Sequence, residues 1–164
     1  MIFEAVEYGL HRVLHHPSVA RWVPYHKRHH RRYHDSHEYN GTTIKALLQQ
    51  VGVTGLFLAA WINEWGAIAL YVTWAIMVYN AMHCVSHTNV WPTVRAYHRA
   101  HHRNPFKNIG VSSPLIDWGC GTMHPEFVVR TPFLLLLPPP ISFLGVRHKP
   151  SESTKSTFVP IPHL

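Results

Sequence analysis

The sequence predicts an all-α integral membrane helical bundle, with one transmembrane hairpin and cytoplasmic-face helices that carry four histidine clusters. Three observations lead to this prediction. Hydrophobic residues make up 46% of the chain and charged residues only 14%, where a soluble domain carries about a quarter of charged residues. Two apolar runs of helical length lie close together in the sequence. Ten of the 16 histidines follow a spacing that occurs twice.

The length of 164 residues fits one domain. We expect it over residues 1–149, followed by a polar, proline-rich tail over residues 150–164. The net charge of +7 can indicate nucleic acid, an anionic membrane face or acidic substrates, and the apolar runs favour the membrane. Cys84 and Cys120 form no CxxC pair, so the sequence predicts neither a disulfide framework nor a zinc–thiolate site. The first ten residues are too acidic and too short for a signal peptide.

The first histidines fall on two expected helices. Residues 2–16 have the apolar spacing of an amphipathic helix, which Pro17 ends or kinks. His11 and His15 lie four positions apart, so their side chains stack one turn apart on one face. Pro24 can occupy the first turn of the next helix. That helix carries a triplet at i, i+3 and i+4, namely His26, His29 and His30.

The apolar runs cover residues 46–62 and 65–82, with only Asn63 and Glu64 between them. Each is about 26 Å long as a helix, against a hydrocarbon core of about 30 Å, so together they predict a transmembrane hairpin. Two buried helices of a soluble protein are the alternative. A hairpin returns to the face that it left, so both halves of the histidine pattern meet there. Lysine and arginine concentrate on that side, which the positive-inside rule makes cytoplasmic.

The second half of the chain repeats the order of pair and triplet. His83 and His87 form the second pair, at the end of the second run. Pro92 can begin a further helix that ends before Pro105. That helix carries the second triplet, namely His98, His101 and His102.

The C-terminal part gives weaker signals. We expect a loop over residues 104–124, with a tight turn at residues 119–121. The stretch 127–146 is apolar but is broken by Pro132 and by the prolines at 138–140. This pattern favours a surface-lying or re-entrant segment over a regular span.

Ten imidazoles are too many for one metal ion and about right for two. Neutral imidazole suits iron, zinc, copper and nickel. The patterned carboxylates of soluble di-iron bundles are absent from the sequence, so we expect an all-nitrogen site for two ions. The candidate ligands are His11, His15, His26, His29, His30, His83, His87, His98, His101 and His102. Spacing alone does not assign five of them to either ion.

The remaining polar residues are expected to have other roles. Six histidines fall outside the pattern and are expected at the surface or beside the ligands: His16, His34, His37, His124, His148 and His163. Asp117 is expected to be a cap or a hydrogen-bond partner. Because carboxylates are few, backbone carbonyls are expected to orient many of the imidazoles. The basic residues suit lipid headgroups better than a nucleic acid, so no nucleic acid is predicted.

These motifs resemble the fatty acid hydroxylase/sterol desaturase superfamily of membrane di-iron oxygenases. HRVLHHP at residues 11–17 and HKRHH at residues 26–30 resemble its opening histidine boxes, and NAMHCVSH at residues 80–87 resembles its third cluster. YHRAHHRNPFKNIGVSSPLIDWGCGT at residues 97–122 is similar to its closing signature. In that signature HxxHH precedes an Asn-aromatic-Gly element, whose aromatic residue is replaced here by Ile109, and an Asp-x-x-x-Gly-Thr element.

The resemblance implies an O2-dependent hydroxylase or desaturase of a lipid, either a sterol or a fatty acyl chain. It implies two iron ions, which zinc could replace in a purified sample, and an electron donor such as cytochrome b5 or ferredoxin. It also implies a multi-pass protein, of the endoplasmic reticulum if eukaryotic and of the inner membrane if bacterial. Members usually carry further spans before the first box, so a homo-oligomer that completes the lipid channel is an open expectation. A carotenoid hydroxylase and a non-catalytic metal-binding remnant stay open as alternatives.

Overall fold

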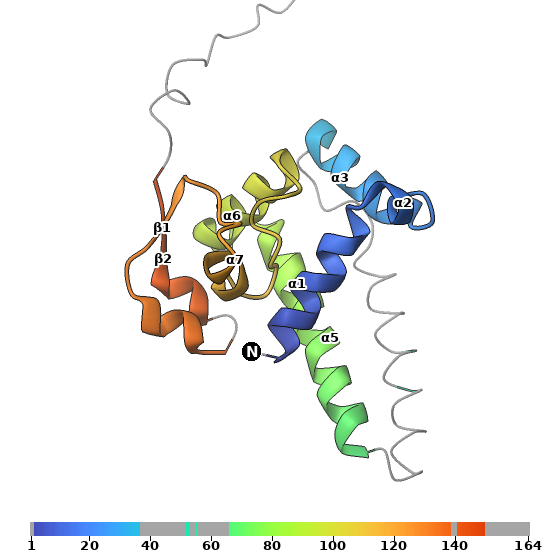
Figure 1. Ribbon diagram of the computed structural model, residues 1–164, viewed down its shortest axis with the longest axis horizontal. Helices are drawn as coiled ribbons and strands as arrows, with labels where there is room; N and C mark the ends of the chain where they lie inside the picture. The colour runs from blue at the N-terminus through green and yellow to red at the C-terminus, as the bar shows by residue number, and fades with distance from the viewer. Residues whose placement is uncertain (1, 37–51, 53–54, 56–65, 139–140, 150–164) are drawn as a thin grey trace, which may run out of the picture.

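The computed structural model describes residues 2–36, 52, 55, 66–138 and 141–149. In these ranges the elements are α1 (Ile2–Leu14), α2 (Pro17–Ala20), α3 (Pro24–Ser36), α5 (Gly66–Ser86), α6 (Pro92–Arg103), α7 (Leu115–Gly119), β1 (Phe127–Val129), η2 (Pro132–Leu136), η3 (Ile141–Gly145) and β2 (Val146–His148). Figure 1 shows α1, α3 and α6 gathered around the C-terminal end of α5, whose N-terminal part extends away from them.

Part of the prediction falls outside the described residues. The first apolar run lies there except for Gly52 and Gly55, so the hairpin stays a prediction. The tail at residues 150–164 also lies there, and the proposed division of the chain into domain and tail is not tested.

Prolines set the helix boundaries as predicted. α1 ends at Leu14, shortly before Pro17, which is the first residue of α2. Pro24 begins α3 and Pro92 begins α6, where a missing backbone N–H costs no helical hydrogen bond. His16 caps α2, because its Nδ1 accepts a hydrogen bond from the Ser18 backbone N–H at 3.3 Å. Its position therefore turns it away from the metal-binding pattern.

α5 has the properties of a membrane-spanning helix. Among the described residues it is the one helix long and apolar enough to cross a membrane, with a mean hydropathy of 1.5 in its best window. Only 17% of that window is buried inside the protein, which distinguishes α5 from the core helix of a soluble protein. Its large apolar side chains are exposed instead, namely Ile68, Leu70, Tyr71, Trp74 and Met77. An exposed apolar surface of this kind is typical of a helix that contacts a membrane.

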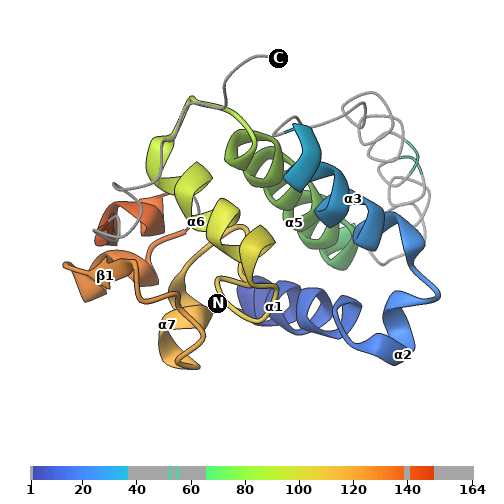
Figure 2. The same ribbon diagram turned by 90° about the horizontal axis from the view of Figure 1, so that it is seen from above.

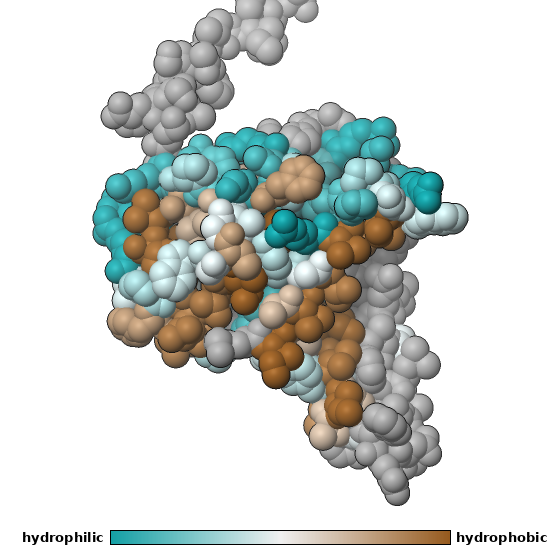
Figure 3. Space-filling model, in the orientation of Figure 1, coloured by the Kyte–Doolittle hydropathy of each residue, from teal (hydrophilic) through white to brown (hydrophobic). Residues whose placement is uncertain are grey.

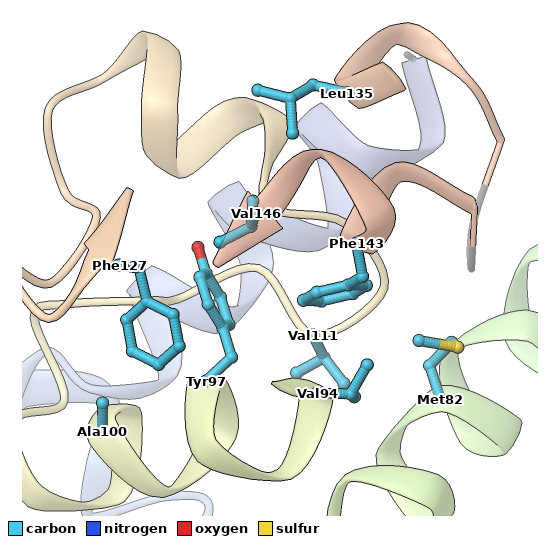
Figure 4. Close-up of a cluster of buried hydrophobic side chains, with 9 residues drawn as sticks. All are labelled: Met82, Val94, Tyr97, Ala100, Val111, Phe127, Leu135, Phe143 and Val146. Atoms are coloured by element: carbon cyan, nitrogen blue, oxygen red, sulfur yellow. The ribbon is translucent and has the colours of Figure 1, made fainter. Parts of the chain in front are cut away.

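The core lies between α6, the end of α5 and the C-terminal elements (Figure 4). Tyr97 is at its centre, with its ring edge-to-face with Phe127 at 5.0 Å and with Phe143 at 5.3 Å. Val94 and Ala100, on the same side of α6, are also buried. The adjoining side of α6 is thereby fixed in direction, and that side carries its buried histidines.

The C-terminal region corrects the all-α prediction. β1 and β2 pair antiparallel, with Phe127 opposite His148 and Val129 opposite Val146. Two 3₁₀-helices, η2 and η3, lie between them, so the described residues of this stretch form no regular span, as predicted. Strands of three residues are too short to show an alternating pattern in the sequence, which is why the sheet was missed. The predicted loop at 104–124 likewise contains the short helix α7.

Apolar and polar surfaces lie on different sides of the molecule. Figure 3 shows hydrophilic residues over the end where α3 and α6 lie, and hydrophobic residues over α5 and the neighbouring elements. The connection between β1 and β2 contributes to the apolar side through exposed Phe133, Leu136, Leu137, Ile141 and Leu144. This division agrees with a protein that meets a membrane on one side.

Candidate metal centre

Four segments bring their histidines to one place. α1 supplies the first pair and α3 the first triplet; α5 and the residue just after it supply the second pair, and α6 the second triplet. Figure 2, seen from above, shows the C-terminal end of α6 pointing between α1 and α3. The N-terminal and C-terminal halves of the pattern therefore meet, as the sequence predicted.

The histidines form two compact groups, in each of which the ligand nitrogens lie within 4.8 Å of one another. Cluster 1 consists of His11, His15, His30 and His101. Cluster 2 consists of His29, His87, His98 and His102. Each cluster takes three residues from one half of the chain and one from the other, so neither half builds a cluster alone.

Neighbouring histidines are divided between the clusters. His29 and His30 are consecutive on α3 but belong to different clusters, and so do His101 and His102 on α6. Consecutive side chains of a helix point about 100° apart, so one helix can face two centres at once. Histidine spacing alone did not reveal this division, because it depends on where α3 and α6 cross.

The two remaining candidates each lie against one cluster. His26 has its Nε2 3.1 Å from Nε2 of His15, and its ring centroid is 4.7 Å from that of His30. His83 has its Nε2 3.1 Å from Nε2 of His29, and its ring centroid is 4.9 Å from that of His98. The geometry therefore groups the ten candidates as five and five, and their binding of metal stays a prediction.

The donor atoms of cluster 1 fit a cation. A carbonyl oxygen only accepts, so Nδ1 of His11 donates to the Ile109 carbonyl at 2.6 Å, and Nδ1 of His101 donates to the Lys107 carbonyl at 3.0 Å. In a neutral imidazole the other nitrogen, Nε2, then carries a lone pair. Nε2 of His30 is buried without a hydrogen-bond partner among the residues that the structure describes. Lone pairs that converge in this way repel one another unless a cation lies between them.

Cluster 2 shows the same convergence. Nε2 of His98 lies 3.0 Å from Nε2 of His87 and 2.9 Å from Nε2 of His102. One proton can satisfy only one of these contacts, whereas a metal ion accepts all three lone pairs. Four imidazoles around each position are a donor set that iron, zinc, copper and nickel accept.

The histidines are held in the neutral form that binds metal. Burial, followed by repulsion from the neighbouring imidazoles, lowers the pKa of His11 and of His26 to about 3. Burial also lowers the pKa of His29 to about 4 and that of His87 to about 3. At neutral pH no proton has to leave these rings before a metal ion binds.

Asp117 has the supporting role expected for it. Its carboxylate is fully buried and accepts hydrogen bonds from the Ile109 N–H at 2.9 Å and the Gly110 N–H at 2.7 Å. It also accepts from the hydroxyls of Thr122 at 2.6 Å and Tyr97 at 3.0 Å. Burial raises its pKa although these bonds act in the opposite direction. Asp117 thus fixes the segment whose carbonyl orients His11.

Glu7 is a buried residue that the sequence interpretation missed. It is 7% exposed and accepts hydrogen bonds from the backbone N–H groups of Val111 at 2.6 Å and Ser112 at 3.2 Å. Burial raises the pKa of Glu7 to about 7. A signal was available, because Glu7 precedes His11 by four positions and therefore shares its face of α1.

The other histidines lie elsewhere. His124 and His148 approach the Glu126 carboxylate, at 3.6 and 3.8 Å, beside the small sheet. His37, His163 and the side chain of His34 lie outside the described residues.

An apolar cavity of about 560 Å³ lies between α1 and α5. His11 of cluster 1 forms part of its wall, together with Glu7. The rest of the wall comes from Ile2, Phe3, Val6, Leu10, Leu14, Tyr71, Val72, Ala75, Ile76 and Tyr79. The cavity therefore joins the exposed side of the candidate membrane helix to a histidine cluster.

A second pocket, of about 770 Å³, adjoins cluster 1 and is basic in character. Arg21, Lys27 and Arg103 line it, and no acidic residue is among its lining residues in the described chain. His15, His26, His30 and His102 form its inner wall. The clusters are therefore approached by an apolar cavity and by a basic pocket.

Comparison with known proteins agrees with this donor set. A search of curated proteins and a search of solved structures each find no match. The model of the fatty acid hydroxylase family matches residues 1–122 of the 164, a range that contains all ten clustered histidines. The chain therefore belongs to the fatty acid hydroxylase family, a family of membrane-bound oxidoreductases.

Proposed function

We propose that this protein is a membrane di-iron oxygenase that hydroxylates or desaturates a lipid, a sterol or a fatty acyl chain, with O2 and externally supplied electrons. The observation that carries the proposal is the contact between an apolar cavity and one of two adjacent four-histidine clusters. An apolar cavity selects an alkyl chain, and an all-imidazole pair of sites suits redox metals. In this proposal, an alkyl chain bound in the cavity would have a C–H bond close to the metal pair.

The ten histidines are proposed as the ligands, five for each ion. His26 would complete cluster 1 and His83 would complete cluster 2, because each lies against its cluster. Two iron ions bound there would supply the oxidising power that no side chain of the protein has. The protein itself orients the imidazoles, binds the alkyl chain and excludes water through the apolar walls of the cavity.

The membrane position follows from the distribution of charge. The exposed basic residues of α2 to α3 and of α6 lie on the side of the clusters, namely Arg21, Lys27, Arg28, Arg31, Arg99 and Arg103. By the positive-inside rule this side is cytoplasmic. We propose a multi-pass protein of the endoplasmic reticulum or of a bacterial inner membrane, in which a lipid chain enters the cavity laterally between α1 and α5.

The basic pocket suits the electron donor. Arg21, Lys27 and Arg103 surround an opening that leads to cluster 1, and an acidic carrier such as cytochrome b5 or a ferredoxin would match their charge. The Arg21→Glu and Lys27→Glu variants should raise the KM for the carrier and leave the metal content of the purified protein unchanged. An unchanged KM in both variants would place the docking surface elsewhere.

Lipid analysis tests the proposed activity. The full chain is expressed in a host with a working electron donor, and lipids are analysed by mass spectrometry after growth with isotopically labelled O2. Wild type should yield a hydroxylated product that carries the label, or a desaturated product, and both His98→Ala and His101→Ala should abolish it. His148→Ala, outside both clusters, is the matched control.

The outcomes also separate the alternatives. Metal retained by the wild type together with unchanged lipids would favour a non-catalytic metal-binding protein. Wild type that binds no metal would exclude the oxygenase, whatever its lipid profile.

A further inference from the structure

The segment at residues 109–112 is held by two buried carboxylates, those of Asp117 and Glu7. Its four consecutive backbone N–H groups all donate to acidic side chains. Asp117 accepts from Ile109 and Gly110, at 2.9 and 2.7 Å. Glu7 accepts from Val111 and Ser112, at 2.6 and 3.2 Å. The conformation of this segment therefore depends on both carboxylates.

The same segment orients a candidate metal ligand. The Ile109 carbonyl accepts the Nδ1 proton of His11 at 2.6 Å, and the neighbouring Lys107 carbonyl accepts that of His101 at 3.0 Å. Both imidazoles belong to cluster 1. Each hydrogen bond fixes the tautomer of its ring and directs the opposite nitrogen, Nε2, to the cluster. A shift of this segment would therefore turn His11, and a shift that extended to Lys107 would turn His101 as well.

Glu7 connects this segment to the helix that carries His11. Glu7 and His11 are one turn apart on α1, and they contact the segment at Val111 and Ile109. A closed loop results, from α1 through the Glu7 carboxylate and the segment back to the His11 ring. Closed loops of this kind fix both the axial position of a helix and the direction of a side chain on it.

We propose that Glu7 is a positioning residue for cluster 1: it aligns His11, through residues 109–112, for metal binding. The inference rests on the proposed metal site. Glu7 acts as a hydrogen-bond acceptor: its Oε1 receives the N–H groups of Val111 and Ser112, and its Oε2 also lies 3.3 Å from the Ser112 nitrogen. Glutamine carries an amide oxygen at the same place and should therefore replace it, whereas leucine of similar size leaves two buried donors without an acceptor.

Cobalt(II) titration of the full chain in detergent tests the proposal, since the absorption of the bound ion reports each site without turnover. Wild type should bind at two sites. The Glu7→Leu variant should lose about 10- to 100-fold in affinity at one site and keep the other. Glu7→Gln should stay close to wild type. Tyr8→Phe is the matched control, since Tyr8 also joins α1 to this region, through Thr122 at 3.2 Å, but not to residues 109–112.

Double variants identify the affected site. In a His98→Ala background, which disables cluster 2, Glu7→Leu should weaken the remaining site by the full amount. In a His101→Ala background, which disables cluster 1, Glu7→Leu should add nothing, because the two changes act on one site.

Each other result overturns the proposal. Equal losses at both sites, or failure of Glu7→Leu to accumulate as folded protein, would show that Glu7 supports the whole fold. Two unchanged sites would show that residues 109–112 do not need it. If Glu7→Gln loses as much cobalt affinity as Glu7→Leu, the negative charge of Glu7 or its ability to transfer a proton matters, and not its role as a hydrogen-bond acceptor. Wild type that binds no cobalt would contradict the proposed metal site itself, and this result can be distinguished from the results that contradict only the role of Glu7.

Discussion

His30 and His102 stack ring against ring, with their centroids 4.2 Å apart and their planes inclined by 26°. They belong to different clusters, so the two clusters contact each other through this pair of rings. Loss of either ring removes a ligand on one side and a packing surface on the other.

Replacement of His30 should therefore affect the clusters unequally. In His30→Ala, cobalt affinity at cluster 1 should fall by about 10-fold or more, and that at cluster 2 by a smaller factor of about threefold to tenfold, the value of an aromatic contact. His30→Phe should restore only cluster 2, because phenylalanine stacks but does not ligate. Two-site titration measures both values, and equal behaviour of the alanine and phenylalanine variants would exclude the coupling.

Gly110 lies where the chain leaves no room for a side chain. A Cβ atom there would be 2.4 Å from the Ser113 carbonyl oxygen and 3.1 Å from Oδ2 of Asp117. Gly110→Ala should lower stability by about 1–3 kcal/mol, as overpacking does, and thereby lower the thermal midpoint in detergent. Gly119→Ala is the control, because a Cβ at Gly119 meets nothing within 4 Å. Equal midpoints for the two variants would contradict the geometry.

The buried histidines predict the pH dependence of the metal-free protein. The unfolded chain binds protons on histidine below its ordinary pKa of about 6.5, whereas His11 and His26 stay neutral down to about pH 3 and His29 to about pH 4. The unfolded state thus holds more protons, so the free energy of unfolding rises with pH from about 4 to 6.5.

Two buried acidic groups oppose this trend, but they are fewer than the buried histidines. Burial raises the pKa of Glu7 to about 7, so its contribution to stability falls as the pH rises from its ordinary value near 4.5, and Asp117 acts in the same direction. Chemical unfolding of the metal-free protein at several pH values measures the balance. A free energy of unfolding that falls between pH 4 and 6.5 would show that the acids dominate.

The connection between β1 and β2 should touch the bilayer. Phe133, Leu136 and Leu144 are 65%, 60% and 62% exposed, and they lie outside the range of the family match. A spin label at Leu144→Cys, in a background without Cys84 and Cys120, should be more accessible to oxygen than to a water-soluble nickel reagent. A label at Arg99→Cys should show the reverse, and the same preference at both positions would exclude this orientation.

Much of the fold follows from local signals in the sequence. Pro17, Pro24 and Pro92 mark helix boundaries because proline acts through its own backbone. The histidine pairs and triplets likewise predict shared helix faces, because residues three or four positions apart lie on one side of a helix. The pairing of β1 with β2 was not predictable in this way, because three-residue strands depend on contacts distant in sequence.

The site shows the same division between local and distant information. Spacing indicated that ten imidazoles meet, but the separation of His29 from His30 needed the crossing of α3 with α6. Glu7 was overlooked because its partners lie more than a hundred residues away, at Val111 and Ser112. The resemblance of the closing signature did indicate Asp117, yet its four donors became visible only in three dimensions.

Because both clusters share α3 and α6, the covalent chain itself would fix the distance between two bound ions. Neighbouring ligands on one helix are separated by a single peptide unit, so no hinge or domain movement can draw the centres apart without unwinding a turn. Insertion of one residue between His29 and His30, or between His101 and His102, would redirect every later ring on that helix by about 100°. Evolution can therefore lengthen this protein at its loops, but not inside these two dipeptides.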